Sequence, residues 1–386
     1  MTAFNREEGI MKSKIKYPLI VFVLFFSISA EAKENQKPEW KGTIIKEGEV
    51  TVVKNPKEPR YKEPILTLKE ELILGGSKAQ GESAFSMAWS IAVDNGGNIY
   101  VGDLKQACVK VFDKAGAYLR TIGRRGQGPG EMEGILSVSV GHNNQELIVG
   151  DGYKLVVFDL QGRFKRNLML HSWADKAFLD RTGNVFAWIS DMFERRNILR
   201  LFSPDLTKVL SDIVVIPEPQ DFNMYSPRAY WVLDPQDRLI FGYPKTYEIS
   251  FYNENLKIAK KIVRAYEPVK VTEEDKKIYM KRSLPPGTSG APKHPCPSVH
   301  AAFRSFFIDD NGRLFVQTWE RTSNGRQDIY DVYDSDGHFF GRIALNVHPD
   351  PINPTPRILK NNKLYAVEVD EEGYEVVKRY SVTWKH

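Results

Sequence analysis

Six segments of this chain share one pattern, in which an apolar strand leads into a turn rich in Asp, Asn and Gly and a second apolar or aromatic strand follows. Asp, Asn and Gly tolerate a positive φ and hydrogen-bond their own backbone, so each segment is typical of a β-hairpin. Such a repeat indicates units that cannot bury their apolar faces alone and therefore stack against their neighbours. The six copies begin at Val93, Val140, Leu179, Leu233, Ile308 and Leu359.

Further strands complete each repeat. Apolar segments such as 109–116 and 155–162 follow the hairpins as third strands, and 118–123 is a fourth. Four strands in each of six repeats predict an all-β fold, a six-bladed β-propeller of four-stranded blades. The sixth copy has no fourth strand after 374–384, whereas 64–76 precedes the first copy as 118–123 precedes the second. We therefore expect this N-terminal strand to close the last blade, which removes two open sheet edges.

The N-terminus has the pattern of a secretory signal peptide. Three lysines between residues 12 and 16 precede the apolar run 19–26, and small residues lead up to Ala32. The run is far shorter than the roughly 20 residues of a membrane-spanning helix. We expect residues 1–32 to be cleaved, with 1–10 an over-extended start, and the mature chain to be periplasmic or secreted with no stable membrane span. An uncleaved anchor is the alternative.

The remaining chain divides into an N-terminal extension, 33–63, and the propeller, 64–386. The wide spacing between the fourth and fifth copies places an insertion at about 265–299. Its segment 271–284 predicts a short helix, because Thr272 can cap it and acidic and basic residues lie in its first and last turns. The insertion joins an outer strand to the next inner one, so we expect it on the face where the central channel opens, as a lid or as a solvated elaboration.

Charge and cysteine content limit the function classes. The net charge is +5, from 54 basic and 49 acidic residues, and no basic stripe marks a nucleic-acid surface. An oxidising compartment would permit a Cys108–Cys296 disulfide, but two cysteines give no spacing signature, so the sequence leaves that bridge open. The stretch 123–132, "GRRGQGPGEM", has the composition of an anion-binding loop, yet it opens no helix and joins an outer strand to the next inner one. It is therefore interpreted as a connector.

The segment "SIAVDNGGNIYVGD", followed by "VKVFDKAGAYLRTIGRRGQGPGEM", resembles an NHL repeat. The chain is similar to exported bacterial six-bladed β-propellers of NHL type over about residues 85–170, and the likeness is weaker but periodic to Trp384. This resemblance implies the fold. It leaves the function open, because NHL-like propellers include interaction modules, sensors and metal-dependent lyases or hydrolases.

Comparison of the six repeats with one another singles out charged residues at the start of the innermost strands, which line the channel. Such charges can pair with one another, line a wet channel or bind an anionic ligand. His171, Tyr225 and His300 share the connector position of Phe85 and Met132, for which packing between blades is the favoured interpretation. The predicted ligand-binding residues at the channel mouth are Arg228, Arg304, Arg357, Asp175, Lys176, His171, Tyr225, His300, Trp173 and Trp319.

The sequence contains neither a G-x-S-x-G elbow nor an H-E-x-x-H motif. Asp103 and Asp151 end second strands and are interpreted as turn caps. Calcium or zinc would need convergent ligands, which the sequence supports only weakly, so no cofactor is expected. The favoured function is a non-catalytic binding or scaffolding propeller for an anionic small molecule, peptide, glycan or protein. The alternative is a metal-dependent hydrolase or lyase with its site at the channel mouth.

Overall fold

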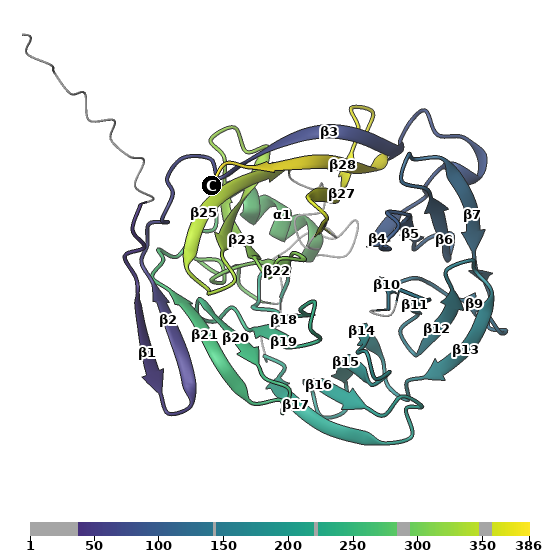
Figure 1. Cartoon of the computed structure of the whole chain (residues 1–386), viewed down its shortest axis with the longest axis horizontal. Coiled ribbons are helices and arrows are strands. Elements are labelled where there is room, and N and C mark those ends of the chain that lie inside the picture. Colours follow the sequence, from purple (N-terminus) through teal and green to yellow (C-terminus); the bar gives the residue numbers. More distant parts are fainter. Residues whose placement is uncertain (1–37, 142–143, 220–222, 284–293, 347–356) are drawn as a thin grey trace, which may run out of the picture. The chain divides into compact units, whose positions relative to one another are not determined.

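Six antiparallel sheets, each built on four neighbouring strands, form the core of residues 39–386. Figure 1 shows them arranged as blades around a ring, with the first strand of each blade nearest the centre. The prediction of an all-β, six-bladed propeller is confirmed. The predicted signal peptide, 1–32, lies outside the described residues. The computed structural model describes residues 38–141, 144–219, 223–283, 294–346 and 357–386.

In blades 1 to 3 several of the turns that join the strands are closed by an aspartate. After β4, for example, Oδ1 of Asp94 accepts a hydrogen bond from the backbone N–H of Asn98 at 2.8 Å. This bond satisfies a backbone donor where the chain reverses. The strands are β4 (Ala88–Val93), β5 (Ile99–Asp103), β6 (Cys108–Phe112) and β7 (Tyr118–Ile122) in blade 1, β10 (Ser137–Val140), β11 (Glu146–Gly150), β12 (Lys154–Asp159) and β13 (Phe164–Met169) in blade 2, and β14 (Ala174–Leu179), β15 (Val185–Asp191), β16 (Arg196–Phe202) and β17 (Val209–Pro217) in blade 3.

The last blade contains strands from both ends of the propeller. β3 pairs antiparallel with β28 in a register that runs from Gly75 opposite Val376 to Leu66 opposite Trp384, which confirms the predicted closure. The strands are β18 (Tyr230–Leu233), β19 (Leu239–Gly242), β20 (Glu248–Tyr252) and β21 (Ile258–Arg264) in blade 4, β22 (Ser305–Ile308), β23 (Leu314–Arg321), β24 (Gln327–Tyr333) and β25 (Phe339–Asn346) in blade 5, and β26 (Arg357–Lys360), β27 (Lys363–Val369), β28 (Glu375–Trp384) and β3 (Leu66–Gly75) in blade 6.

Neighbouring blades share apolar cores, and these cores continue across the junction of the two ends. Between blades 1 and 2, Val111 and Met132 are fully buried in one cluster. Between blades 6 and 1, Leu74 and Val377 pack in one cluster with Ala88 of β4. Because each blade buries both of its faces in this way, packing closes the ring as well as the backbone ladder of β3 and β28.

The N-terminal extension contains a hairpin that the sequence reasoning missed. β1 (Thr43–Glu47) pairs antiparallel with β2 (Val50–Asn55), and β2 adds parallel to β21, which gives blade 4 a six-stranded sheet. The side chain of Asn55, the last residue of β2, anchors the end of this hairpin to blade 5. Its Nδ2 donates to the carbonyl of Gly337 at 2.9 Å, and its Oδ1 accepts from the N–H of Phe339 at 2.6 Å.

The Gly- and Arg-rich stretch is a connector, as predicted. Two short strands within it, β8 (Arg124–Arg125) and β9 (Glu131–Met132), pair in parallel, and a short 3₁₀ turn (Gly81–Ser83) lies in the preceding connector. Glu131 accepts hydrogen bonds from the Arg124 side chain at 2.8 Å and from the N–H of Gly128 at 2.9 Å. The arginine charge is therefore partly neutralised within the loop.

Helix α1 (Glu273–Ser283) lies in the insertion between blades 4 and 5. Thr272 caps it as predicted. The Thr272 hydroxyl accepts from the N–H of Asp275 at 3.1 Å, and the Asp275 carboxylate accepts from the N–H of Thr272 at 2.9 Å, which is a reciprocal capping box. In the part of the chain that the structure describes, no helix is long and apolar enough to cross a membrane.

Candidate functional site

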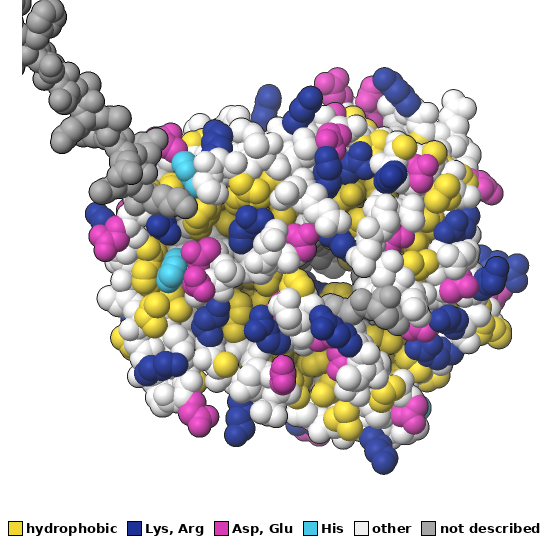
Figure 2. Space-filling model, in the orientation of Figure 1, with side chains coloured by type: hydrophobic (Ala, Val, Ile, Leu, Met, Phe, Trp, Pro, Cys, Tyr) yellow, Lys and Arg dark blue, Asp and Glu magenta, His cyan; other side chains and the backbone are white. Residues whose placement is uncertain are grey.

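The two faces of the ring carry different turns. Because strands alternate in direction, turns between strands 1 and 2 and between strands 3 and 4 lie on one face. The other face carries the turns between strands 2 and 3, the connectors that join successive blades, and helix α1. We call it the connector face. Figure 2 shows one face of the molecule, with basic and acidic side chains interspersed around a central opening.

Aspartates at the ends of second strands hold the connector face together. Asp103 accepts from the N–H groups of Ser86 at 2.6 Å and Gln106 at 2.9 Å. Asp151 accepts from the N–H of Gly134 at 3.0 Å. Each carboxylate ties the end of a second strand to the incoming connector, so the prediction that they are caps is confirmed.

A pocket opens between blades 4 and 5 on the connector face. The space inside it is about 20 Å³, little more than one water molecule requires. It can therefore hold one small group of a ligand but cannot enclose a sugar or a side chain of ordinary size. Its lining residues are Met224, Ser226, Arg228, Tyr230, Pro244, Ala301, Phe303, Arg304 and Trp319.

The polar groups that line this pocket can all donate hydrogen bonds, and none is a carboxylate. Arg228 is exposed, whereas Arg304 is 6% exposed and pairs with Asp328 at 3.2 Å. Burial lowers the pKa of Arg304, and the charge of Asp328 acts in the opposite direction. Burial raises the pKa of Tyr230, against the charges of Arg228 and Arg304. The phenol of Tyr230 therefore stays neutral and can donate.

Aromatic stacking connects the pocket to α1. The Arg304 guanidinium lies over the Trp319 ring, 4.9 Å from its centroid. Trp319 stacks on His300 with centroids 4.0 Å apart, and His300 Nε2 lies 3.2 Å from Oδ2 of Asp275 in α1. Burial acts to raise the pKa of Asp275, but hydrogen bonds from His300 and Thr272 outweigh it and lower that pKa.

Tyr225 belongs to the same cluster. Its hydroxyl donates to the carbonyl of Asp275 at 2.7 Å, and its ring contacts His300, Trp319 and Tyr279 of α1. Burial raises the pKa of Tyr225. The structure therefore brings five predicted residues together at blades 4 and 5, with Tyr225 and His300 as packing groups beneath the pocket. These five are Arg228, Arg304, Tyr225, His300 and Trp319.

A second group of predicted residues lies on blade 3. Trp173 Nε1 donates to Asp175 at 2.6 Å, and His171 is exposed beside them in the connector. Lys176 donates from Nζ to the carbonyl of Trp231 at 2.8 Å and lies over the rings of Phe178 and Trp231. Burial lowers the pKa of Lys176 to about 8. This lysine links blade 3 to blade 4.

Arg357 does not line the pocket. It is 7% exposed and donates to the Tyr330 hydroxyl and to the carbonyl of Asn346, with its guanidinium 4.9 Å from the centroid of the Tyr330 ring. Burial lowers its pKa to about 10. The first residue of β26 therefore points into the junction of blades 5 and 6 and joins them.

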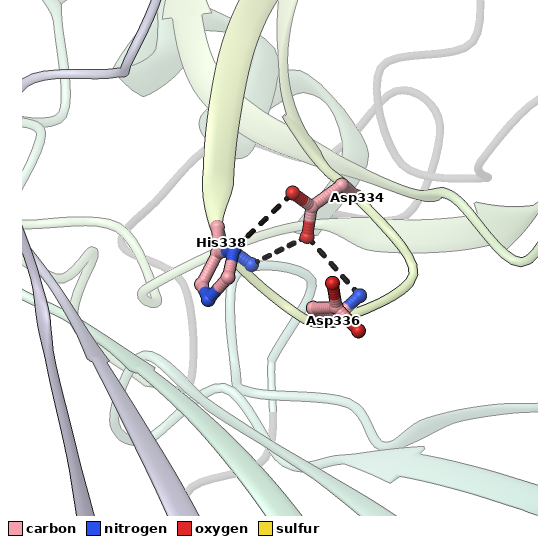
Figure 3. A group of neighbouring side chains, drawn as sticks. All are labelled: Asp334, Asp336 and His338. Atoms are coloured by element: carbon pink, nitrogen blue, oxygen red, sulfur yellow. Dashed lines mark hydrogen bonds and ion pairs between the residues drawn. The ribbon is translucent and has the colours of Figure 1, made fainter. Parts of the chain in front are cut away.

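Asp334, Asp336 and His338 are close enough together to hold a metal ion (Figure 3). Asp334 Oδ1 accepts from the N–H groups of Asp336 at 3.1 Å and His338 at 2.9 Å, while Oδ2 lies 3.3 Å from His338 Nδ1. Asp159 makes the same pair of backbone bonds in the matching turn of blade 2, where no histidine follows. The geometry of Asp334 is thus that of an ordinary turn of this fold.

The sequence reasoning missed Ser226 and Tyr230 in the pocket and Asp275 beneath it. Tyr230 begins an innermost strand in the segment compared between repeats, so its position could have been flagged. Asp275 lies in the cap of α1, and nothing in the sequence indicated that its carboxylate would contact His300. Cys108 is buried and Cys296 half-buried, and both thiols are unpaired, so the disulfide that the sequence left open is not formed. Burial raises the pKa of each thiol.

Comparison with known proteins identifies the class of fold. A family model described as a 6-bladed beta-propeller matches residues 87–203, from blade 1 into blade 3. A candidate exported protein from Bacteroides fragilis is 12% identical, covers 87% of this chain and 100% of its own, and superposes with a TM-score of 0.54. A member of the DUF4221 family from Bacteroides vulgatus is 12% identical over 83% of this chain and 99% of its own, with a TM-score of 0.53. No curated protein matches the sequence significantly.

Proposed function

We propose that this propeller is a binding protein that receives an anionic group of its ligand in the pocket between blades 4 and 5. One observation carries the proposal. The pocket is lined by two arginines, a tyrosine, a serine and a tryptophan, and no carboxylate lines it. A lining rich in hydrogen-bond donors suits a carboxylate, sulfate or phosphate group, although one of its guanidinium groups, that of Arg304, is also paired with Asp328. The indole Nε1 of Trp319 is buried and has no hydrogen-bond partner among the described residues.

The proposal is non-catalytic. Asp328 neutralises Arg304, and the Asp275–His300 pair is buried beneath Trp319. A general acid or base must come within hydrogen-bond reach of the reacting group. Here the pocket lining supplies permanently charged or neutral donors, which bind and orient an anion.

The experiment is calorimetric titration with matched ligands, glucuronate against glucose and a peptide with a free C-terminal carboxylate against its amide. We expect only the anionic member of each pair to bind. Arg228→Ala should weaken that binding roughly ten-fold, the usual cost of one charged hydrogen-bond partner. Lys378→Ala, on β28 of blade 6, is the control and should change nothing. Binding of the neutral members that ignores Arg228 and Arg304 would contradict the proposal.

We also propose export. The support is the basic, apolar and small-residue pattern that ends at Ala32, and one structural relative is itself described as exported. Mass spectrometry of the protein from the cell envelope should show a mature N-terminus at or near Lys33. Recovery of the intact apolar run 19–26 would show that the segment is retained.

A further inference from the structure

The turn between β15 and β16 presents two large apolar side chains to solvent. Met192 is 77% exposed and Phe193 is 100% exposed. Single exposed apolar residues are common on protein surfaces, but adjacent ones at a turn tip form a patch. We call the segment 191–196 the blade 3 finger.

The finger is a hydrogen-bonded turn whose backbone does not require these side chains. Asp191 Oδ1 accepts from the N–H of Glu194 at 3.1 Å, and Arg195 has a φ of 50°. Blade 1 repeats this geometry, because Asp103 accepts from the N–H of Gln106 at 2.9 Å and the following Ala107 has a φ of 53°.

At the two exposed positions the turns differ. Where blade 3 has Met192 and Phe193, blade 1 has the half-buried Leu104 and the exposed Lys105. The same turn therefore forms with a lysine in place of the phenylalanine. Local structure does not account for a fully exposed aromatic ring, which is costly in water and typical of binding hot spots.

Exposed apolar side chains are also distributed unevenly between the faces. Among the described residues outside the outermost strands and the N-terminal hairpin, every large apolar side chain that is strongly exposed lies on the connector face. These residues are Tyr153, Met192, Phe193, Met280, Val299 and Tyr374. The described turns of the opposite face carry no strongly exposed large apolar side chain, so these residues favour docking of an apolar partner on the connector face.

The finger lies within reach of the pocket. The carbonyl of Arg195 accepts from the N–H of Glu218 at 2.8 Å, which ties the finger to the start of the connector to blade 4. Met224 of the pocket follows Glu218 by six residues, a chain length that spans at most about 22 Å when fully extended. An extended segment of similar length can therefore contact both sites.

We propose that the ligand is an extended polypeptide segment, with an acidic group in the pocket and apolar side chains against Met192 and Phe193. This inference rests on the proposed function. The donors that line the pocket favour an acidic group, and its volume of about 20 Å³ admits little more than one such group, so the remainder of the ligand must lie on the face outside. The apolar finger matches side chains of a peptide better than the hydroxyl groups of a glycan.

The test selects peptides from a displayed random library on the full-length protein, and then titrates synthetic versions by fluorescence anisotropy. We expect selected peptides to combine an Asp, a Glu or the free C-terminus with nearby apolar residues. Phe193→Lys copies the blade 1 turn and should fold normally, yet weaken binding roughly ten-fold or more. Val209→Lys, which changes an exposed apolar residue on β17 of the same blade, should bind as the wild type.

Three outcomes separate the inference from the proposed function. If Arg228→Ala weakens the peptides and Phe193→Lys does not, the inference is overturned and the anion pocket stands. If only Phe193→Lys weakens the binding of the peptides, the anion pocket is not part of the binding site. Both the proposed function and this inference are then overturned. If no peptide is selected, but vesicles of phosphatidylcholine and phosphatidylglycerol bind the wild type and not Phe193→Lys, a lipid surface replaces the polypeptide and the inference is overturned.

Discussion

The imidazole of His300 lies flat on the indole of Trp319, with ring centroids 4.0 Å apart and planes inclined by only 6°. Through this contact the cap of α1 supports the floor of the pocket, because His300 Nε2 lies 3.2 Å from the Asp275 carboxylate. Stacking between the two rings fixes the orientation of both. The position of Trp319, and with it the guanidinium of Arg304 above the ring, depends on a helix outside the blades.

His300→Ala should therefore destabilise the fold by about 2–3 kcal/mol, because it leaves a cavity and removes a hydrogen bond to a buried carboxylate. His171→Ala provides the control, since His171 occupies the same connector position in blade 3 and is exposed. We expect the unfolding free energy of His171→Ala, measured in urea, to lie within about 0.5 kcal/mol of the wild-type value. Equal unfolding free energies for the two variants would show that the stack contributes nothing to stability.

The same pair gives a prediction for acid. The pKa of Asp275 is lowered in the folded protein, because hydrogen bonds from His300 and Thr272 outweigh the opposing effect of burial. Its contribution to stability is therefore complete above the ordinary pKa of about 3.9 and is lost as the pH falls toward the folded value. Asp275→Asn should flatten this part of the stability profile, measured by urea unfolding between about pH 6 and pH 3. A wild-type slope in the variant would assign the acid sensitivity to other groups.

Closure of the ring by the N-terminal strand can be tested with two neighbouring residues of β3. Leu74 is 4% exposed and lies in the core between blades 6 and 1, whereas Ile73 is 49% exposed. Leu74→Ala should cost about 2–4 kcal/mol of unfolding free energy, and Ile73→Ala less than about 0.5 kcal/mol. If the two variants have the same unfolding free energy, the packing of β3 against blades 6 and 1 does not stabilise the closed ring.

Much of the fold could be predicted from the sequence, because the residue types that recur in each repeat are those that turns and buried strands require. Turn residues recur between apolar strands, and a missing fourth strand in the last copy pointed to 64–76. The hairpin of β1 and β2 did not follow, because a six-by-four template has no place for it and its edge strand is largely exposed.

The site was harder to predict because position in a repeat does not fix where a long side chain ends. Arg304 lies four residues before Ile308 and Arg357 two residues before Leu359, at the starts of their repeats, yet only Arg304 lines the pocket, while Arg357 reaches back to Tyr330. Phe193 gave no signal at all. A phenylalanine between apolar strands is usually buried, and only the geometry of its turn shows that it is not.

The turn that contains Asp334, Asp336 and His338 yields a prediction on metal. Because Asp334 repeats the bonds of Asp159, we expect a chelator to leave the thermal unfolding temperature unchanged. Asp334→Ala and Asp159→Ala should lower stability by similar amounts, since each removes two hydrogen bonds to backbone N–H groups. Stoichiometric zinc or calcium in purified protein, lost only in Asp334→Ala, would instead identify a metal site at this turn.

Lys176 provides the last prediction. Its amine is enclosed by the Trp231 carbonyl and two aromatic rings, and burial lowers its pKa to about 8. In the unfolded chain a lysine titrates near 10.4, so between about pH 8 and pH 10 the unfolded state holds more protons than the folded one. Stability contributed by this group therefore rises with pH across that window and is lost as the pH falls through 8.

Lys176→Met removes the titrating amine while keeping an apolar stem against the same rings. Relative to the wild type, its unfolding free energy should be most favourable below about pH 8 and should lose that advantage steadily toward pH 10. The lost bond to Trp231 adds an offset that does not depend on pH, so the slope of the difference is the quantity to measure. Lys245→Met, at an exposed lysine of blade 4, is the matched control in the same urea series. A flat difference for Lys176→Met would mean that the pKa of Lys176 is the same in the folded and the unfolded states.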